Sequence, residues 1–310
     1  MDKIALSVEN LTKVYSKNKK IGVSNKALND LSFNVKQGEV FGLLGPNGAG
    51  KTTFLSVLAG TVTKTGGRIN VWGFDLDQNP RQVRASIGIV PQEVNLDAFF
   101  SPRKLLELQA GLYGVPKKDR ITDIIIKMVS LEKEADSYAR NLSGGMKRRL
   151  LIAKAMVHQP PILVLDEPTA GVDVELRKNL WENVKALNKE GVTIILTTHY
   201  LFEAQEMCNR IAIIDRGNLV ALDTTQKLLD RIQTKKITFK ISEGYSSKSL
   251  NLPGVTFNSE NNNLITAVYE KNSYKFDDIA NVLSQNNIKI LDITTEDSDL
   301  EDVFTQLTNH

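Results

Sequence analysis

The segment GPNGAGKTT, Gly45–Thr53, has the residue types and spacing of a phosphate-binding loop. Its glycines would let the backbone approach a phosphate closely, Lys51 would neutralise β and γ phosphates, and Thr52 would offer a hydroxyl to Mg²⁺. The segment follows the apolar run VFGLL, which predicts a buried strand. This pattern predicts nucleotide binding. The residues that we expect to contact the nucleotide here are Gly45, Pro46, Asn47, Gly48, Ala49, Gly50, Lys51, Thr52 and Thr53.

A pair of carboxylates, Asp166 and Glu167, closes the apolar run ILVLD. Asp166 could reach Mg²⁺ directly or through water, and Glu167 could polarise a water for in-line attack on the γ-phosphate. The pair therefore indicates hydrolysis. The alternative interpretation is a strand that ends in two solvated acids.

Three further side chains follow apolar runs or strand-like segments. His199 ends TIILTTH, and in a parallel sheet it would share one edge with Gly45 and Glu167, where it could contact the γ-phosphate or the attacking water. Gln92 in IVPQE could touch Mg²⁺ or that water through its amide. Tyr15 offers a ring for adenine to stack on, although a single aromatic residue is more often part of a core or a rim.

The elements that must position these residues can be read from periodicity. Alternation at Ile4, Leu6 and Val8, and again from Leu31 to Val35, predicts half-buried strands. ILVLD, TIILTTH and IAIID alternate with helical segments, one of them at 174–188, which predicts parallel strands in an α/β frame. DRGN then predicts a hairpin turn. The lysines at 17, 19, 20 and 26 suggest a solvated loop.

Two stretches depart from this frame. From 102 to 157 the period becomes helical, in PRKLLELQAGLYG, RITDIIIKMVSL and MKRRLLIAKAMVH, which indicates an inserted helical block. After Arg231 the pattern is a strand KKITFKIS, a polar loop through NSENNN, a helix KFDDIANVLSQ, a strand IKILDIT and a helix DLEDVFTQLT. That succession predicts a small α+β domain.

Composition agrees with this division into two units. The chain has 310 residues, 41% of them apolar and 24% charged, as in soluble globular proteins, and a net charge of +3. Cys208 is the single cysteine, which excludes an internal disulfide and favours a reducing compartment. We find no apolar run long enough to span a membrane and no apolar core in the N-terminal decapeptide, so we expect neither secretion nor a membrane span.

A second glycine motif, LSGGM at Leu142–Met146, precedes a basic helix and also suggests backbone amides facing a phosphate. With it, the motifs resemble the ATP-binding cassette (ABC) family over about the first 230 residues. The resemblance implies a P-loop NTPase fold of RecA-like type with an inserted helical subdomain. It implies an adenine-stacking role for Tyr15, a glutamine loop at Gln92, metal and base carboxylates at Asp166 and Glu167, and a switch histidine at His199.

In that family two cassettes pair head to tail, and the signature of one closes over the ATP of the other. The resemblance therefore implies that Ser143, Gly144 and Gly145 act in trans, together with Asp173 of the D-loop AGVD. The family's usual glutamine at the end of the signature is replaced by Met146, which puts any contact from that side chain in doubt. The resemblance also implies ATP and Mg²⁺ as ligands, with Mg²⁺ held by Thr52, Gln92 and Asp166.

The signature LSGGMKRRL and the tail further resemble ATPases that serve ABC-2 type exporters of drugs, polysaccharides or lipids. We therefore expect a cassette at 1–230, with its helical subdomain at about 93–160, and an accessory α+β domain at 231–310. The expected partners are a second cassette in a homodimer and an ABC-2 transmembrane permease docked on the helical subdomain, with no nucleic acid. The expected location is the cytoplasmic face of the plasma membrane. An importer ATPase and a soluble ABC ATPase without a membrane partner are the alternatives.

Overall fold

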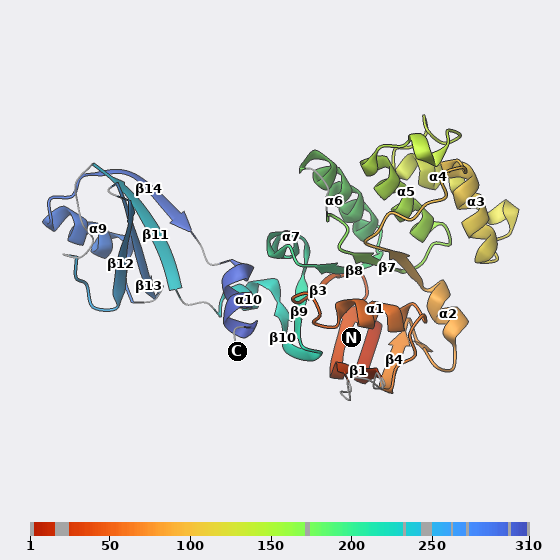
Figure 1. The fold of residues 1–310 in the computed structure, drawn as a ribbon, viewed down its shortest axis with the longest axis horizontal. Coiled ribbons are helices and arrows are strands. Elements are labelled where there is room, and N and C mark those ends of the chain that lie inside the picture. The colour runs from red at the N-terminus through yellow and green to blue at the C-terminus, as the bar shows by residue number, and fades with distance from the viewer. Residues whose placement is uncertain are drawn as a thin grey trace, which may run out of the picture. The chain divides into compact units, whose positions relative to one another are not determined.

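The computed structural model describes residues 3–15, 25–170, 174–231, 234–242, 250–261, 263–270, 273–296 and 299–308. The chain divides into two compact units, Met1–Thr224 and Thr225–His310 (Figure 1). This division falls at Thr224, before the boundary at 230 that the sequence suggested. Helix α8 (Thr225–Leu229) therefore belongs to the second unit.

The first unit contains a six-stranded sheet in the order β10-β9-β3-β8-β7-β6. All neighbouring pairs are parallel except the β9–β10 hairpin, so the predicted parallel frame and the predicted hairpin at DRGN are confirmed. Every residue of β3 (VFGLL) and of β8 (TIILTT) is buried, as expected for central strands of a sheet that is covered on both faces. The strands are β3 (Val40–Leu44), β6 (Ile87–Val90), β7 (Ile162–Asp166), β8 (Thr193–Thr198), β9 (Arg210–Asp215) and β10 (Asn218–Thr224).

An antiparallel sheet in the order β2-β1-β4-β5 completes the frame, with β1 (Ile4–Tyr15), β2 (Asn25–Lys36), β4 (Gly66–Val71) and β5 (Phe74–Asp75). The predicted alternation at Ile4 is wrong, because Ile4 is 41% exposed while Ala5 and Leu6 are both buried. A register shift between Ile4 and Leu6 causes this break in the period. Lys26 is also corrected: it is exposed, but it lies on strand β2, paired with Val14, and not in a loop.

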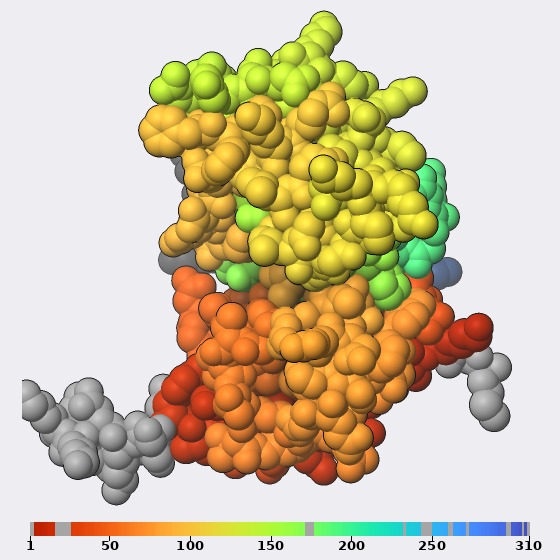
Figure 2. Space-filling view, turned by 90° about the vertical axis from the view of Figure 1, so that its right-hand side faces the viewer, coloured from red at the N-terminus to blue at the C-terminus, as the bar shows by residue number. Residues whose placement is uncertain are grey.

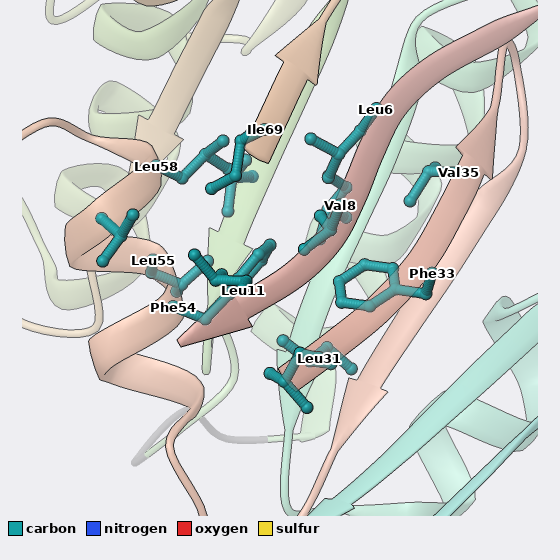
Figure 3. Close-up of a cluster of buried hydrophobic side chains, with 14 of the residues drawn as sticks. Leu6, Val8, Leu11, Leu31, Phe33, Val35, Phe54, Leu55, Leu58 and Ile69 are labelled. Carbon is teal, nitrogen blue, oxygen red and sulfur yellow. The ribbon is translucent and has the colours of Figure 1, made fainter. Parts of the chain in front are cut away.

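Helix α1 (Lys51–Leu58) joins the two sheets through one hydrophobic core. Figure 3 shows Phe54, Leu55 and Leu58 beside Leu11 and Ile69 in this cluster. Phe54 also meets Phe33 of β2, with ring centroids 5.5 Å apart. The core therefore fixes the helix that immediately follows the predicted phosphate loop.

The predicted helical block is confirmed as α3 (Pro102–Leu112), α4 (Thr122–Met128) and α5 (Gly144–Met156), with single 3₁₀ turns at Lys117–Asp119 and Ala139–Asn141. Ser101 caps α3 and Ser143 caps α5, each accepting a backbone N–H from the third residue that follows it. Figure 2 shows this block, in yellow and yellow-green, above the orange surface around α2 (Pro80–Ala85). Helices α6 (Val174–Lys189) and α7 (Leu201–Met207) complete the unit.

The second unit is α+β, as predicted. Its antiparallel sheet has the order β12-β13-β11-β14, and α9 (Phe276–Gln285) packs on the sheet through Ile279 and Leu283. The loop predicted through NSENNN is wrong, because Asn258 and Ser259 pair with Thr266 and Ile265 in a hairpin. The strands are β11 (Thr234–Ile241), β12 (Val255–Asn261), β13 (Leu264–Glu270) and β14 (Ile290–Glu296), and α10 (Leu300–Thr308) follows them.

In the described part of the chain, no helix has both the length and the apolar character needed to cross a bilayer.

Candidate functional site

The glycine-rich segment joins the carboxyl end of β3 to the start of α1. A Cβ at Gly45 would lie 2.3 Å from the carbonyl oxygen of Ile214, and one at Gly50 would lie 2.6 Å from that of Ala27. Gly50 also has φ of 112°, which side chains rarely adopt. Glycine is therefore required at both positions, and the loop wraps tightly over the first turn of α1.

Lys51 is buried at the first position of α1. Its Nζ donates hydrogen bonds to the carbonyl oxygens of Gly45 at 2.5 Å and Pro46 at 3.2 Å, which folds the side chain back over the loop. Burial lowers the pKa of the ammonium, while the nearby carboxylates of Glu167 and Asp166 oppose that shift. The loop therefore holds a partly desolvated cation, which is suited to an anionic ligand.

The two predicted carboxylates lie at the end of β7. The Oγ1 hydroxyl of Thr197, on the neighbouring strand β8, donates a hydrogen bond to Asp166 Oδ1 at 2.6 Å. Burial nevertheless raises the pKa of Asp166, against the effects of Thr197 and Lys51. Glu167 is 8% exposed and has φ of 44°, and its N–H donates to the Thr197 carbonyl at 3.0 Å.

Gln92 and His199 converge on a single oxygen of Glu167. The Gln92 Nε2 donates to Glu167 Oε2 at 3.0 Å, and His199 Nδ1 lies 3.1 Å from the same atom. These residues come from the ends of β6, β7 and β8, which are neighbouring parallel strands. The structure therefore gathers at one sheet edge the three side chains that the sequence proposed for hydrolysis.

A cavity of about 710 Å³ opens over this edge. Tyr15 lines it and is 40% exposed, with the Lys13 Nζ 4.8 Å from its ring centroid. Gly45, Ala49 and Asp166 are absent from the described lining, and Ala49 is buried with its carbonyl accepting the Gly217 N–H. The lining residues are Tyr15, Lys26, Ala27, Pro46, Asn47, Gly48, Gly50, Lys51, Thr52, Thr53, Gln92, Glu167, His199 and Arg216.

Lys26, Ala27 and Arg216 were not among the residues predicted for this site. Arg216 follows β9, whose carboxyl end lies at the same edge as that of β3, so the position of the DRGN turn was a usable signal. Lys26 enters through the pairing of β2 with β1, next to Tyr15. That pairing carries no local signature in the sequence.

The LSGGM segment stands apart from the cavity. Among the described lining residues none comes from 142–146. Ser143 and Gly144 are exposed at the start of α5, Gly145 is buried, and the Ser143 Oγ accepts the Met146 N–H at 3.3 Å. Asp173 lies outside the described residues.

Comparisons with known proteins agree on one family. The ABC transporter family matches residues 28–170. The chain is 38% identical over 230 residues to the linearmycin resistance ATP-binding protein LnrL of Bacillus subtilis, covering 73% of this chain and 71% of the relative. It is 40% identical over 205 residues to the Nod factor export ATP-binding protein I of Cupriavidus pinatubonensis, covering 66% of this chain and 63% of that relative.

Solved structures give the same fold. A dimeric bacterial ABC transporter cassette matches with a TM-score of 0.62 and 26% identity, over 71% of this chain and 98% of that one. The cbiO1 protein of Clostridium perfringens, part of the ABC transporter complex cbiONQ, matches with a TM-score of 0.65 and 28% identity, over 74% of this chain and 92% of that one.

Proposed function

Because this chain belongs to the ABC transporter family and is an ATP-binding cassette ATPase, we propose that it powers export through a separate membrane subunit. In this proposal the protein works as a head-to-tail homodimer on the cytoplasmic face of the membrane. The convergence of Gln92 and His199 on Glu167, beside Lys51, is the observation that carries the hydrolytic part.

The geometry of the cavity supports a role for each of its main side chains. ATP places its adenine near Tyr15 and its phosphates along Gly45–Thr53, where Lys51 neutralises negative charge that grows on the γ-phosphate in the transition state. Glu167 orients the attacking water and accepts its proton, while Gln92 and His199 hold the carboxylate and contact water or the γ-phosphate. The side chains of Tyr15, Lys51, Gln92, Glu167 and His199, to which these roles are given, all line the cavity.

The donor set also fits Mg²⁺. A hydroxyl at Thr52, an amide oxygen at Gln92 and a carboxylate at Asp166 are the oxygen ligands that this hard cation prefers. Burial raises the pKa of Asp166, and a cation bound there would offset this penalty on the charged carboxylate. When bound with ATP, the cation would neutralise phosphate charge.

The signature is proposed to act on the ATP of the partner. Ser143 and Gly144 are exposed at the N-terminus of α5, where the amides and the helix dipole favour an anion. They are not among the described residues that line the cavity of their own chain, which supports their presentation by a second copy. Asp173 is proposed to join the same contact.

ATP-driven dimerisation tests this arrangement. Glu167→Gln should trap a dimer in MgATP, because it removes the base and keeps the shape. Adding Ser143→Arg should abolish that dimer and leave ATP binding to the monomer nearly unchanged, measured by light scattering and by nucleotide titration. Ser143→Ala is the matched control, because it loses the same helix cap without adding bulk. A double variant that still dimerises would contradict a lid in trans.

The exporter assignment draws on the names of two relatives, which concern Nod factor export and linearmycin resistance. The signature LSGGMKRRL and the C-terminal α+β unit support the ABC-2 type, with an ABC-2 permease as the membrane partner and that unit as an accessory domain. The transported compound would be bound by the permease.

Co-purification separates this proposal from an importer ATPase and from a soluble ABC ATPase. The tagged chain should recover a polytopic membrane protein of the ABC-2 class from detergent-solubilised membranes of its own host, identified by mass spectrometry. Recovery of an importer permease with a binding protein, or of soluble partners alone, would contradict the exporter assignment and leave the ATPase assignment standing.

A further inference from the structure

Arg148 is a cation on α5 that is almost wholly withdrawn from solvent, with 5% exposed. Its Nη1 donates to the carbonyl oxygens of Pro91 at 3.1 Å and Gln92 at 2.6 Å, and its Nη2 donates to that of Ala170 at 3.5 Å. Within the described residues its hydrogen-bond partners are all backbone carbonyls, and burial lowers the pKa of the guanidinium. Packing alone does not account for this costly burial of a charge.

The three carbonyls belong to the two segments that contact Glu167. Gln92 donates its side-chain amide to Glu167 Oε2 at 3.0 Å, and Ala170 donates its N–H to the Glu167 carbonyl at 3.2 Å. Arg148, Gln92, Glu167 and Ala170 thus form a closed ring of hydrogen bonds. The planar guanidinium suits this position because its fork of donors can reach both segments at once.

We propose that Arg148 is a positioning residue for ATP hydrolysis, which fixes Gln92 and Glu167 relative to helix α5. The same helix begins at the Ser143 cap, about 7.5 Å along its axis from Arg148. A contact of Ser143 or Gly144 with the partner's ATP is therefore linked, through one rigid helix and one guanidinium, to the base that acts on this chain's own ATP. This inference rests on the proposed role of Glu167.

Arg149 supplies a matched control. It is the next residue on α5, and its Nη1 donates to the carbonyls of Val129 at 2.8 Å and Ser130 at 3.0 Å, which belong to the helical block. Arg148→Met should lower kcat about 10- to 100-fold and change the KM for ATP by less than about twofold, because binding groups stay in place while the base is misplaced. Arg149→Met should leave kcat close to that of the parent.

Arg148→Lys keeps the charge but not the fork, so its kcat should lie between those of the parent and Arg148→Met. This variant carries the test if Arg148→Met does not fold, as judged by thermal melting and ATP titration. An equal loss in Arg148→Met and Arg149→Met, a parental kcat in Arg148→Lys, or a parallel change in kcat and KM would overturn the inference.

A double-mutant cycle tests whether Arg148 acts through Glu167. In a Glu167→Gln background, Arg148→Met should change the residual turnover by less than about twofold, because the carboxylate base that it positions is already absent. An equal fold-loss in both backgrounds would overturn the inference alone. Parental turnover in Glu167→Gln would instead overturn the proposed role of Glu167.

Discussion

At the scale of single residues, Glu167 shows how the backbone can orient the carboxylate that we propose as the base. Its φ of 44° lies in the left-handed region, which costs free energy for a residue with a side chain. The bond from its N–H to the Thr197 carbonyl holds this conformation at the end of β7. The chain turns there, and the carboxylate meets Gln92 and His199.

Lys51 gives a direct test of the phosphate loop. Lys51→Ala should weaken ATP binding and reduce turnover about 100-fold or more, because a buried ammonium no longer faces the phosphates. Lys178→Ala, an exposed lysine on α6, should leave both properties unchanged. Nucleotide titration and phosphate release measure the two effects. Parental turnover in Lys51→Ala would remove the phosphate-loop assignment.

The raised pKa of Asp166 predicts that the Asp166→Asn substitution stabilises the folded protein by an amount that depends on pH. Burial raises its pKa in the folded state, so the charged carboxylate destabilises the folded protein at neutral pH, and this penalty disappears as pH falls through the raised pKa. Asp166→Asn should therefore raise the melting temperature without nucleotide at about pH 8, and the gain should shrink as the pH falls through the raised pKa. Turnover should fall sharply. A melting temperature lowered by Asp166→Asn at neutral pH would contradict the shift.

The sequence predicted most of the candidate site because the residues that could do chemistry directly follow apolar, strand-forming runs. Gln92, Glu167 and His199 each end an apolar run, and parallel strands end at one edge, so their convergence follows from topology. Lys26 and Arg216 escaped prediction because they reach the cavity through a neighbouring hairpin and a turn. The sequence did not predict that the Arg148 guanidinium is buried, because its partners are three backbone carbonyls that lie far from it in the chain.

At the scale of elements, α1 depends on the core beneath it. Phe54 is 0% exposed and packs on Phe33, so Phe54→Ala should reduce the free energy of unfolding by about 3–5 kcal/mol. Phe74→Ala on β5, where the side chain is 37% exposed, should cost about 0.5 kcal/mol or less. Denaturant unfolding compares the two variants. Equal losses would show that α1 is not anchored by this core.

Hydrophobic periodicity in the sequence located helices that bury one face. It failed for a strand whose position depends on pairing with another strand. The helix at 102–112 shows a clear cap and helical spacing, with Leu105, Leu106 and Ala110 on its buried face. Strand β12 carries Asn258 and Ser259 into the sheet because its partner β13 supplies the apolar face. The composition of NSENNN is that of a loop, and only the long-range pairing overrides it.

At the scale of the whole molecule, the two units should be separable at Thr224. A chain of residues 1–224 should fold and bind ATP with nearly unchanged affinity, because every described residue that lines the cavity belongs to that unit. A chain of residues 1–231 should melt lower or aggregate, because it keeps α8 and loses α10, which packs against it. Leu228 of α8 is 0% exposed in the intact chain. Failure of the 1–224 chain to fold would contradict independent units.

The pairing of α8 with α10 has a consequence for how the second unit could change. Leu300 and Val303 of α10 are 1% exposed. Helix α10 contacts α8, although β11 to β14 and α9 lie between the two helices in the sequence. The sheet and α9 are thus an insertion between two adjacent helices. Domains inserted between two adjacent points of a chain can be deleted or replaced, because the two points of attachment, here α8 and α10, stay in place. A different domain could therefore be grafted between these helices without changing the distance between α8 and α10.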